Sequence, residues 1–325
     1  MRRAAALLIA LLAAGSPGTE ITWPTPSGRP NGVPLADFIQ PTISGRVESG
    51  LFGMVRNDGS RFHEGIDLQP GWVDAQNEPV DVIRAAIAGR VAYVERQVRG
   101  PYGRYVVLEH PSAELPVYTL YAHLAAIDSG LEAGRSVGAG QALGRMGHTS
   151  AGVDPIPVER SHLHFELGLR LSDNFDRWYG RQAEFRNEPN AHGNFNGLNL
   201  VGLDPLPVLL KPRADLHIVV NNLPNALVVT ARASGTPDFV LRHPQLVYGD
   251  PRTAAGWRIE FTWHGLPRRW TALCAGDPAI PAAGWRIERI YDNARERLEQ
   301  RKMLEDGKSS PGETLRRTMG ILLGA

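Results

Sequence analysis

The sequence predicts a mainly β protein in which a large antiparallel β-rich part is followed by a smaller region of mixed β and α structure. Between residues 38 and 168 the apolar residues form short, strand-length runs, and no helical period of comparable length occurs. Glycine or proline separates most of these runs, as turns between strands require. Many short strands joined by such turns are typical of an antiparallel β domain. The clearest runs are residues 80–87, 91–94, 105–108, 117–121 and 163–167.

The second half of the chain has a different pattern. Residues 172–207 are polar and rich in asparagine, which indicates an extended loop that closes the first domain. Strand-like runs then follow at residues 218–220, 226–230, 239–241 and 257–263. The charged stretch 286–306 and the stretch 312–323 are expected to be helices. A seven-residue segment at 254–260 recurs at 282–288, which indicates a duplicated strand.

These patterns divide the chain into four parts. Residues 1–15 have the features of a signal peptide: two arginines, an unbroken apolar run and then small residues where a peptidase would cut. That run is too short to cross a membrane as a helix, so we expect no transmembrane segment in the mature chain. Residues 16–37, rich in proline and glycine, are expected to be a linker or an N-terminal arm. Residues 38–208 form the main domain, and residues 209–325 form an accessory domain of unknown role.

Charge and cysteine content exclude several classes of function. The 325 residues carry a formal net charge of +1, so there is no electrostatic basis for binding nucleic acid. Cys274 is the only cysteine, which excludes an internal disulfide framework and a cysteine-rich metal site. We expect Cys274 to be a small buried apolar side chain.

The histidines are distributed in a way that indicates a metal site. Four of the ten histidines, together with one aspartate, form three compact groups in the β-rich part. On a strand, His162 and His164 would point to the same face, with Leu163 and Phe165 on the other. This pair alone fits either a metal site or two exposed histidines, and cupins and carbonic anhydrases use the same spacing.

Adding the first group makes the metal site more specific. His63 and Asp67 offer a nitrogen and an oxygen, and with one histidine of the pair they complete a two-histidine, one-carboxylate set. Catalytic zinc sites use three protein ligands and leave a fourth position open, although non-haem iron accepts the same ligands. The helical signature His-Glu-x-x-His is absent, because Asp67 stands where its second histidine would be.

The order and separation of the motifs resemble one known family. The motifs Phe-His-Glu-Gly-Ile-Asp at 62–67, Tyr-Ala-His-Leu at 121–124 and His-Leu-His-Phe-Glu at 162–166 are similar to those of the lysostaphin-type (LytM-like) zinc metalloendopeptidases, which hydrolyse peptidoglycan. The segments 52–56 and 140–147 resemble the flanking sequences of that family. The resemblance covers roughly residues 40–170 and implies an antiparallel β-sheet domain with its site in an open groove.

The resemblance also implies roles for individual residues. His63, Asp67 and His164 match the ligands of one zinc ion per chain. His123 and His162 match the two histidines that surround the metal-bound water without binding zinc. The implied function is an exported endopeptidase that cuts peptide cross-links of peptidoglycan in the periplasm or cell envelope, or after secretion. The alternative is a non-catalytic module of the same fold that binds the wall or activates an amidase.

Substrate choice is left open by the sequence. The stretch 148–161 is longer than the family's usual loop and contains proline, and we expect it to border the substrate groove. Cross-links of the D-alanyl–diaminopimelate type are the first expectation, and glycine-rich bridges are the alternative. His148 and His192 are expected to be exposed rather than functional. The sequence identifies no protein partner.

Overall fold

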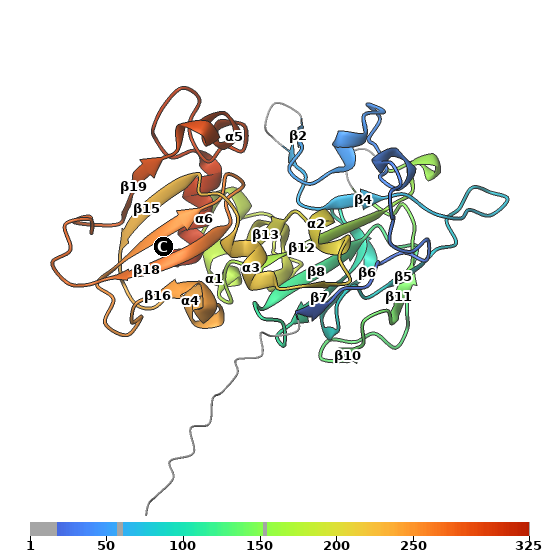
Figure 1. The fold of residues 1–325 in the computed structure, drawn as a ribbon, viewed down its shortest axis with the longest axis horizontal. Coiled ribbons are helices and arrows are strands. Elements are labelled where there is room, and N and C mark those ends of the chain that lie inside the picture. The colour runs from blue at the N-terminus through green and yellow to red at the C-terminus, as the bar shows by residue number, and fades with distance from the viewer. Residues whose placement is uncertain (1–17, 57–60, 152–154, 325) are drawn as a thin grey trace, which may run out of the picture.

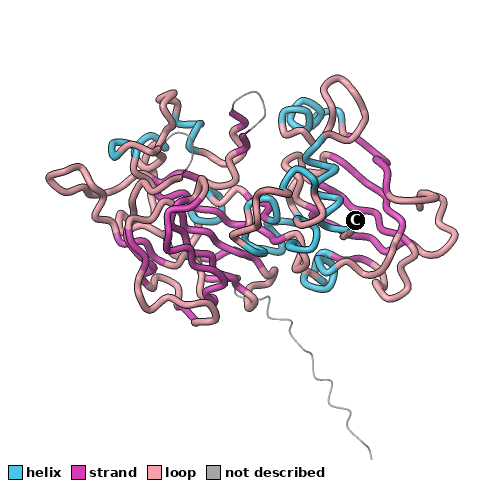
Figure 2. The backbone as a smooth tube through the Cα atoms, turned by 180° about the vertical axis from the view of Figure 1, so that it is seen from behind, coloured by secondary structure: helices cyan, strands magenta, loops and turns pink. Residues whose placement is uncertain are grey.

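The computed structural model describes residues 18–56, 61–151 and 155–324, so the predicted signal peptide lies outside the described residues. The protein is mainly β, with antiparallel sheets, as the sequence predicts (Figure 1). Figure 2 shows the same arrangement from behind, with strands in both halves of the molecule. Among the described residues, no helix combines the length and apolar character needed to cross a membrane.

The first half is organised around a seven-stranded sheet. Its strand order is β10-β6-β7-β8-β12-β13, and β4 pairs with the end of β12 that β13 does not occupy. The strands are β4 (Ile66–Leu68), β6 (Gly89–Arg99), β7 (Gly103–His110), β8 (Val117–Ala122), β10 (Ser136–Val137), β12 (Leu163–Arg170) and β13 (Leu200–Leu203). A three-stranded sheet comprises β5 (Val82–Arg84), β11 (Ala142–Arg145) and β9 (Ala126–Ile127), and a hairpin pairs β2 (Val55–Arg56) with β3 (Arg61–Phe62).

The second half is organised around a five-stranded sheet of order β16-β18-β17-β15-β19. Its strands are β15 (Leu227–Arg232), β16 (Val247–Tyr248), β17 (Gly256–Phe261), β18 (Pro267–Leu273) and β19 (Trp285–Ile290). The helices of the chain are α1 (Phe175–Tyr179), α2 (Leu206–Leu209), α3 (Leu216–Asn221), α4 (Asp238–Arg242), α5 (Arg295–Gln300) and α6 (Glu313–Leu323). Short 3-10 turns lie at Leu35–Asp37, Val47–Gly50, Val158–Arg160, Ala183–Phe185, Gly193–Phe195, Gly197–Asn199, Pro244–Leu246 and Asp292–Ala294.

The repeated segment occupies two strands on either side of a third. Residues 254–260 contribute to β17 and residues 282–288 to β19, and both strands pair antiparallel with β15. The registers match, because Trp257 and Trp285 both lie opposite Ala231. The echo in the sequence therefore corresponds to two strands that are equivalent with respect to β15.

Several expectations for the second half are wrong. Residues 218–220 lie in α3, where the side chain of Asp215 accepts a hydrogen bond from the Ile218 amide and caps the helix. Residues 239–241 lie in α4 rather than in a strand. The stretch 286–306 is not one helix: its first part is β19, and α5 follows.

Two further differences concern residues 172–207 and Cys274. The segment expected to be a loop contains α1 and supplies β13, which pairs with β12 in the main sheet. Cys274 is exposed rather than buried. It lies directly after β18, where the chain leaves the sheet.

The N-terminal segment packs against both halves. Its strand β1 (Thr19–Glu20) pairs with β14 (Arg213–Ala214), and Ile21 and Trp23 are buried in the core. The Thr22 amide donates to the carbonyl of Ala86 at 2.8 Å. Residues 18–23 are therefore part of the folded structure, and the domain boundaries at 37 and 208 stay predictions.

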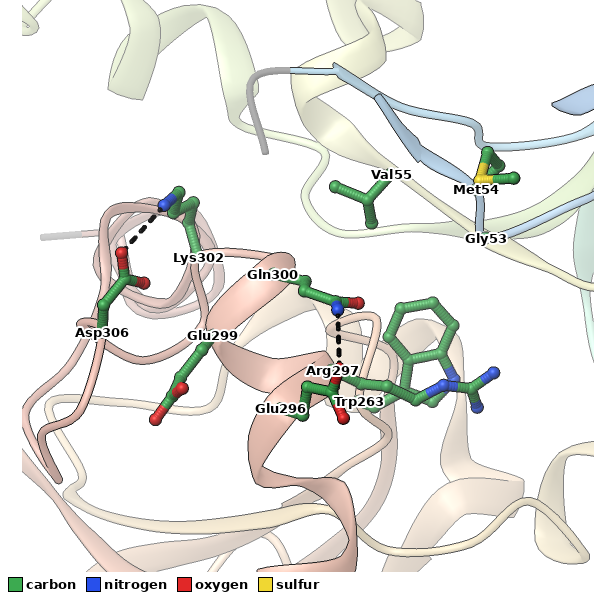
Figure 3. A pocket seen from close by; sticks show the side chains of 10 residues that line it. All are labelled: Gly53, Met54, Val55, Trp263, Glu296, Arg297, Glu299, Gln300, Lys302 and Asp306. Carbon is green, nitrogen blue, oxygen red and sulfur yellow. Dashed lines mark hydrogen bonds and ion pairs between the residues drawn. The ribbon is translucent and has the colours of Figure 1, made fainter. Parts of the chain in front are cut away.

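The two halves share one hydrophobic core and meet beside β3. The core cluster runs from residues of the first sheet, such as Phe165, to residues of the second, such as Trp257. The buried Phe62 of β3 lies edge-on to Trp263, with ring centroids 5.7 Å apart. A Cβ at Gly53, whose φ is +84°, would lie 3.0 Å from the Trp263 ring. Figure 3 shows the small pocket that Trp263 and Arg297 form with residues 53–55.

Candidate metal centre and active site

The strand pairing brings the predicted site residues together at one end of the main sheet. His164 of β12 lies opposite Asp67 of β4 on one side and opposite Ala122 of β8 on the other. His123 directly follows Ala122, and His162 lies just before the first residue of β12. Leu163 and Phe165 belong to the core cluster on the opposite face, which is the alternation the sequence predicts.

Three donor atoms form a compact set. The Asp67 Oδ1 atom lies 3.0 Å from His63 Nε2 and 3.0 Å from His164 Nδ1, and these two nitrogens are 3.2 Å apart. All three side chains are buried. Ligands at about 2.0–2.1 Å from a tetrahedral zinc ion would be about 3.3 Å from one another, so the spacing fits that ion.

Hydrogen bonds outside the set orient both imidazoles. The Nδ1–H group of His63 donates to the carbonyl of Leu51 at 2.8 Å, which leaves the Nε2 lone pair toward Asp67. The Nε2–H group of His164 donates to Glu166 Oε1 at 3.0 Å, which leaves its Nδ1 lone pair toward the same point. A ligand histidine that donates its other nitrogen to a carboxylate or carbonyl is the usual arrangement in metal sites.

Glu166 is a further residue of the candidate site, and the sequence analysis gave it no role. It is fully buried, and its carboxylate also accepts hydrogen bonds from the hydroxyls of Tyr102 at 2.5 Å and Tyr118 at 2.7 Å. Its position two residues after His164 on β12 was the available signal, because side chains at i and i+2 share a face of a strand.

Gly65 lies between two of the candidate ligands and directly against β12. A Cβ at this position would lie 2.2 Å from the carbonyl oxygen of Phe165. The glycine therefore allows the segment that carries His63 and Asp67 to lie directly against β12. Close approach of two backbones, rather than a bend, explains why glycine stands there.

The charges of this centre favour a bound cation. Burial opposes ionisation of Asp67, but the neighbouring imidazoles of His63, His162 and His164 hold the pKa of its carboxyl well below the usual range. Burial also disfavours a charged His164, yet its hydrogen bonds with Asp67 and Glu166 raise its pKa to about 10. The carboxylates of Asp67 and Glu166 thus attract positive charge to the space between the three donor atoms. A divalent metal bound there would replace the proton on His164.

His123 and His162 flank the donor set as neutral imidazoles. Burial, followed by the nearby imidazoles, lowers the pKa of His123 well below its ordinary value, and burial also lowers the pKa of His162. Each donates its Nδ1–H to a backbone carbonyl, His123 to Thr149 at 2.9 Å and His162 to Arg160 at 2.7 Å. The Nε2 lone pair of each ring is therefore available as a proton acceptor.

The backbone of His123 is also unusual. Its φ of +62° lies in the left-handed region, which non-glycine residues adopt at a cost of about 1–3 kcal/mol. The His123 and His162 rings are held 4.8 Å apart, centroid to centroid. The strained conformation thus places the His123 ring beside the donor set.

The centre opens into a groove of about 1020 Å³. One part of its wall comes from the loop after residue 148, including Pro155 and Arg160, as the sequence predicts. A second part comes from the C-terminal region, which contributes His264, Arg301 and Arg317 among others. The groove therefore has a wall that lies outside the segment with the family-like motifs.

His192 and His148 occupy different places. His192 lines the groove and its Nδ1 atom lies 2.8 Å from the Tyr105 hydroxyl. His148 does not line the groove; its Nδ1–H donates to the carbonyl of Ile156 at 2.8 Å, which holds the loop after residue 148 in place. Both histidines are half-buried, so the expectation that they are exposed is wrong, and their lack of function stays a prediction.

Fold and site together give a donor set that could hold a metal ion. The antiparallel sheet carries the buried side chains of His63, Asp67 and His164, with the neutral imidazoles of His123 and His162 beside them. Residues 61–175 match the profile of Peptidase family M23. The segment contains all five predicted site residues. No curated protein matches the chain.

Solved structures of this type resemble part of the chain. A putative glycyl-glycine endopeptidase lytM from Ruminococcus gnavus ATCC 29149 is 21% identical over 59% of this chain and 60% of its own, with a TM-score of 0.35. The catalytic domain of the antimicrobial peptidase lysostaphin from Staphylococcus simulans is 18% identical over 50% of this chain and 90% of its own, with a TM-score of 0.31. A zinc-containing peptidase from Vibrio cholerae is 22% identical over 46% of this chain and 37% of its own, with a TM-score of 0.30. The chain thus spans 60% of the length of the first of these structures.

Proposed function

We propose that this protein is an exported zinc endopeptidase that hydrolyses peptide cross-links of bacterial peptidoglycan. The observation that carries the proposal is the spacing of 3.0–3.2 Å among the donor atoms of His63, Asp67 and His164, with His123 and His162 beside them. Export is proposed from the signal-peptide pattern of residues 1–15. A cross-linked polymer suits an open groove of about 1020 Å³.

The residues divide the chemistry between them. His63, Asp67 and His164 would hold one zinc ion per chain. Zinc lowers the pKa of water to about 7 and polarises the scissile carbonyl. One of the two flanking imidazoles accepts the proton of the attacking water at its free Nε2 atom and later gives it to the leaving amine. The other would donate a hydrogen bond to the developing oxyanion from Nε2 after taking a second proton from solvent, and the negative charge of the oxyanion favours that protonated form.

Hydrogen bonds to Glu166 and to two backbone carbonyls determine which ring nitrogen of these imidazoles carries the proton. Glu166 holds the Nε2–H of His164 and thereby keeps Nδ1 as the donor atom. Thr149 and Arg160 do the same for His123 and His162, because each carbonyl keeps the proton of its ring on Nδ1. No rotation of either ring is then needed before proton transfer.

The test is digestion of purified cross-linked peptidoglycan by the mature protein, with mass spectrometry of the released fragments and analysis of bound metal. New amino termini at a cross-link, abolished by a chelator and restored by zinc, are expected. One equivalent of bound zinc without cleavage would refute the enzyme and favour the wall-binding or amidase-activating module. Turnover by protein free of zinc would refute the mechanism.

A further inference from the structure

One arginine of the C-terminal region lies in the wall of the groove, close to the candidate metal centre. Arg301 directly follows α5 and lines the groove together with His63. Its guanidinium carbon lies 4.2 Å from the centroid of the Phe62 ring, and Phe62 is the residue next to the candidate ligand His63. The guanidinium therefore lies over the face of the Phe62 ring, a position that favours a cation.

The guanidinium of Arg301 is held in place but not neutralised. Among the described residues it forms no hydrogen bond and no ion pair, and its Nε atom is buried without a partner. Burial lowers the pKa of Arg301 and the field of Glu64 raises it, yet the two side chains form no ion pair. Because an arginine stays charged in proteins, this side of the groove carries a positive charge that still has hydrogen bonds to donate.

A second arginine of this wall, Arg317, differs from Arg301 because it has acidic partners. Arg317 of α6 also lines the groove, but it is paired with Glu313 and lies 4.0 Å from Glu184. Arg61 and Arg160 add two further cationic side chains to the lining, against which only Glu64 and Asp67 are acidic. Asp67 is committed to the metal centre, so the groove as a whole favours an anionic ligand.

We propose that Arg301 recognises a free carboxylate on the peptide beside the scissile bond. This inference rests on the proposed function and specifies its substrate class: cross-links in which the carbon that bears the scissile nitrogen also bears a carboxylate. The bridge between D-alanine and diaminopimelate has that carboxylate, and the interior of a glycine bridge does not. The planar guanidinium matches a carboxylate with two parallel hydrogen bonds, which fixes the direction of the peptide in the groove.

Arg297 of α5 provides a matched control. It lies one turn before Arg301, and its guanidinium carbon is 4.6 Å from the centroid of the Trp263 ring. Figure 3 shows that Arg297 borders a separate pocket with Gly53 and Met54, and it does not line the groove. Arg297→Gln therefore removes the same charge and the same kind of stacking without touching the proposed carboxylate site.

The experiment compares three substrates: a D-alanyl–diaminopimelate cross-linked dimer, the same dimer with that carboxylate converted to an amide, and a glycine-bridged peptide. The unsubstituted protein should cleave the free-carboxylate dimer with a kcat/KM about 10- to 100-fold above that of its amide. Arg301→Gln should lose this preference, mainly through a higher KM for the carboxylate dimer, while Arg297→Gln keeps it. Zinc content and melting temperature, measured for both variants, exclude misfolding, and Arg301→Lys should retain part of the preference.

The outcomes separate the two proposals. Equal carboxylate preference in Arg301→Gln and in the unsubstituted protein would overturn the role of Arg301 while leaving the peptidase intact. Faster cleavage of the glycine bridge than of the carboxylate dimer would overturn the substrate class. If no substrate is cleaved, the proposed function fails. The role of Arg301 is then decided by the affinity of the zinc-loaded protein for the free-carboxylate dimer relative to its amide, a preference that Arg301→Gln should lose.

Discussion

Replacement of Glu166 by glutamine tests whether the hydrogen bonds around the donor set control the affinity for zinc. Glu166 is fully buried, and its carboxylate accepts from His164 Nε2 at 3.0 Å and from the hydroxyls of Tyr102 and Tyr118. Glutamine has nearly the same shape but no charge. Its oxygen can still accept one of these bonds, and its NH2 group can donate to a tyrosine hydroxyl, which also accepts.

The expected effect is on the metal rather than on the fold. A charged acceptor makes a hydrogen bond roughly twice as strong as a neutral one, and it raises the basicity of the histidine that donates to it. Loss of such a partner typically weakens metal binding about 10- to 100-fold, or about 1.4–2.7 kcal/mol. Glu166→Gln should therefore lose zinc to a competing chelator at a correspondingly lower chelator concentration, with activity restored by excess zinc.

Glu95 is the matched control for this substitution. It is also buried, and its carboxylate accepts from the Gln97 amide at 2.8 Å and from the Tyr93 hydroxyl at 3.3 Å, but it does not line the groove. Glu95→Gln should bind zinc as the unsubstituted protein does. Equal zinc affinity in Glu166→Gln and Glu95→Gln would refute the inferred role of Glu166.

Three further predictions concern the donor set, the stability and the strand contact. Alanine at any of the three proposed ligands should abolish zinc binding and activity, whereas His123→Ala and His162→Ala should keep zinc and lose about 100- to 1000-fold in kcat; metal analysis beside rate measurements decides this. Burial lowers the pKa of His110 in the folded protein to about 4, so the unfolded chain binds more protons than the folded chain between about pH 6.5 and pH 4. The stability that His110 contributes is therefore complete above that window. It falls by about 2 kcal/mol on acidification from pH 7 to pH 5. Urea unfolding at both pH values should show a smaller difference for His110→Asn. Gly65→Ala should weaken zinc binding, because its Cβ would push Asp67 away from β12, and a normal zinc titration would contradict the role of that contact.

The five site residues could be predicted because their chemistry is tied to short spacings in the sequence. His162 and His164 share a strand face, and His63 and Asp67 lie four residues apart. The strands that carry them are apolar enough to be recognised without tertiary information. Glu166 was missed because a glutamate on a strand carries no signal of its own until the histidine beside it is assigned to a metal.

The C-terminal region was harder to predict because its elements are short and depend on packing. The run at 218–220 is apolar and β-branched, yet the cap at Asp215 and the core around Leu216 make it helical. β19 alternates exposed and half-buried side chains with period two, but its charged residues suggested a helix. In both cases tertiary contacts outweigh the local preference.

The contribution of this region to the groove follows from contacts that no local pattern encodes. Phe62 lies 5.5 Å from Phe52 and 5.7 Å from Trp263, ring to ring, and carries Arg301 on its face. The residue next to the candidate ligand His63 is therefore fixed from both halves of the chain. Because the same contact places Arg301 and supports the metal centre, the C-terminal region is best understood as part of the groove rather than as a separate binding module.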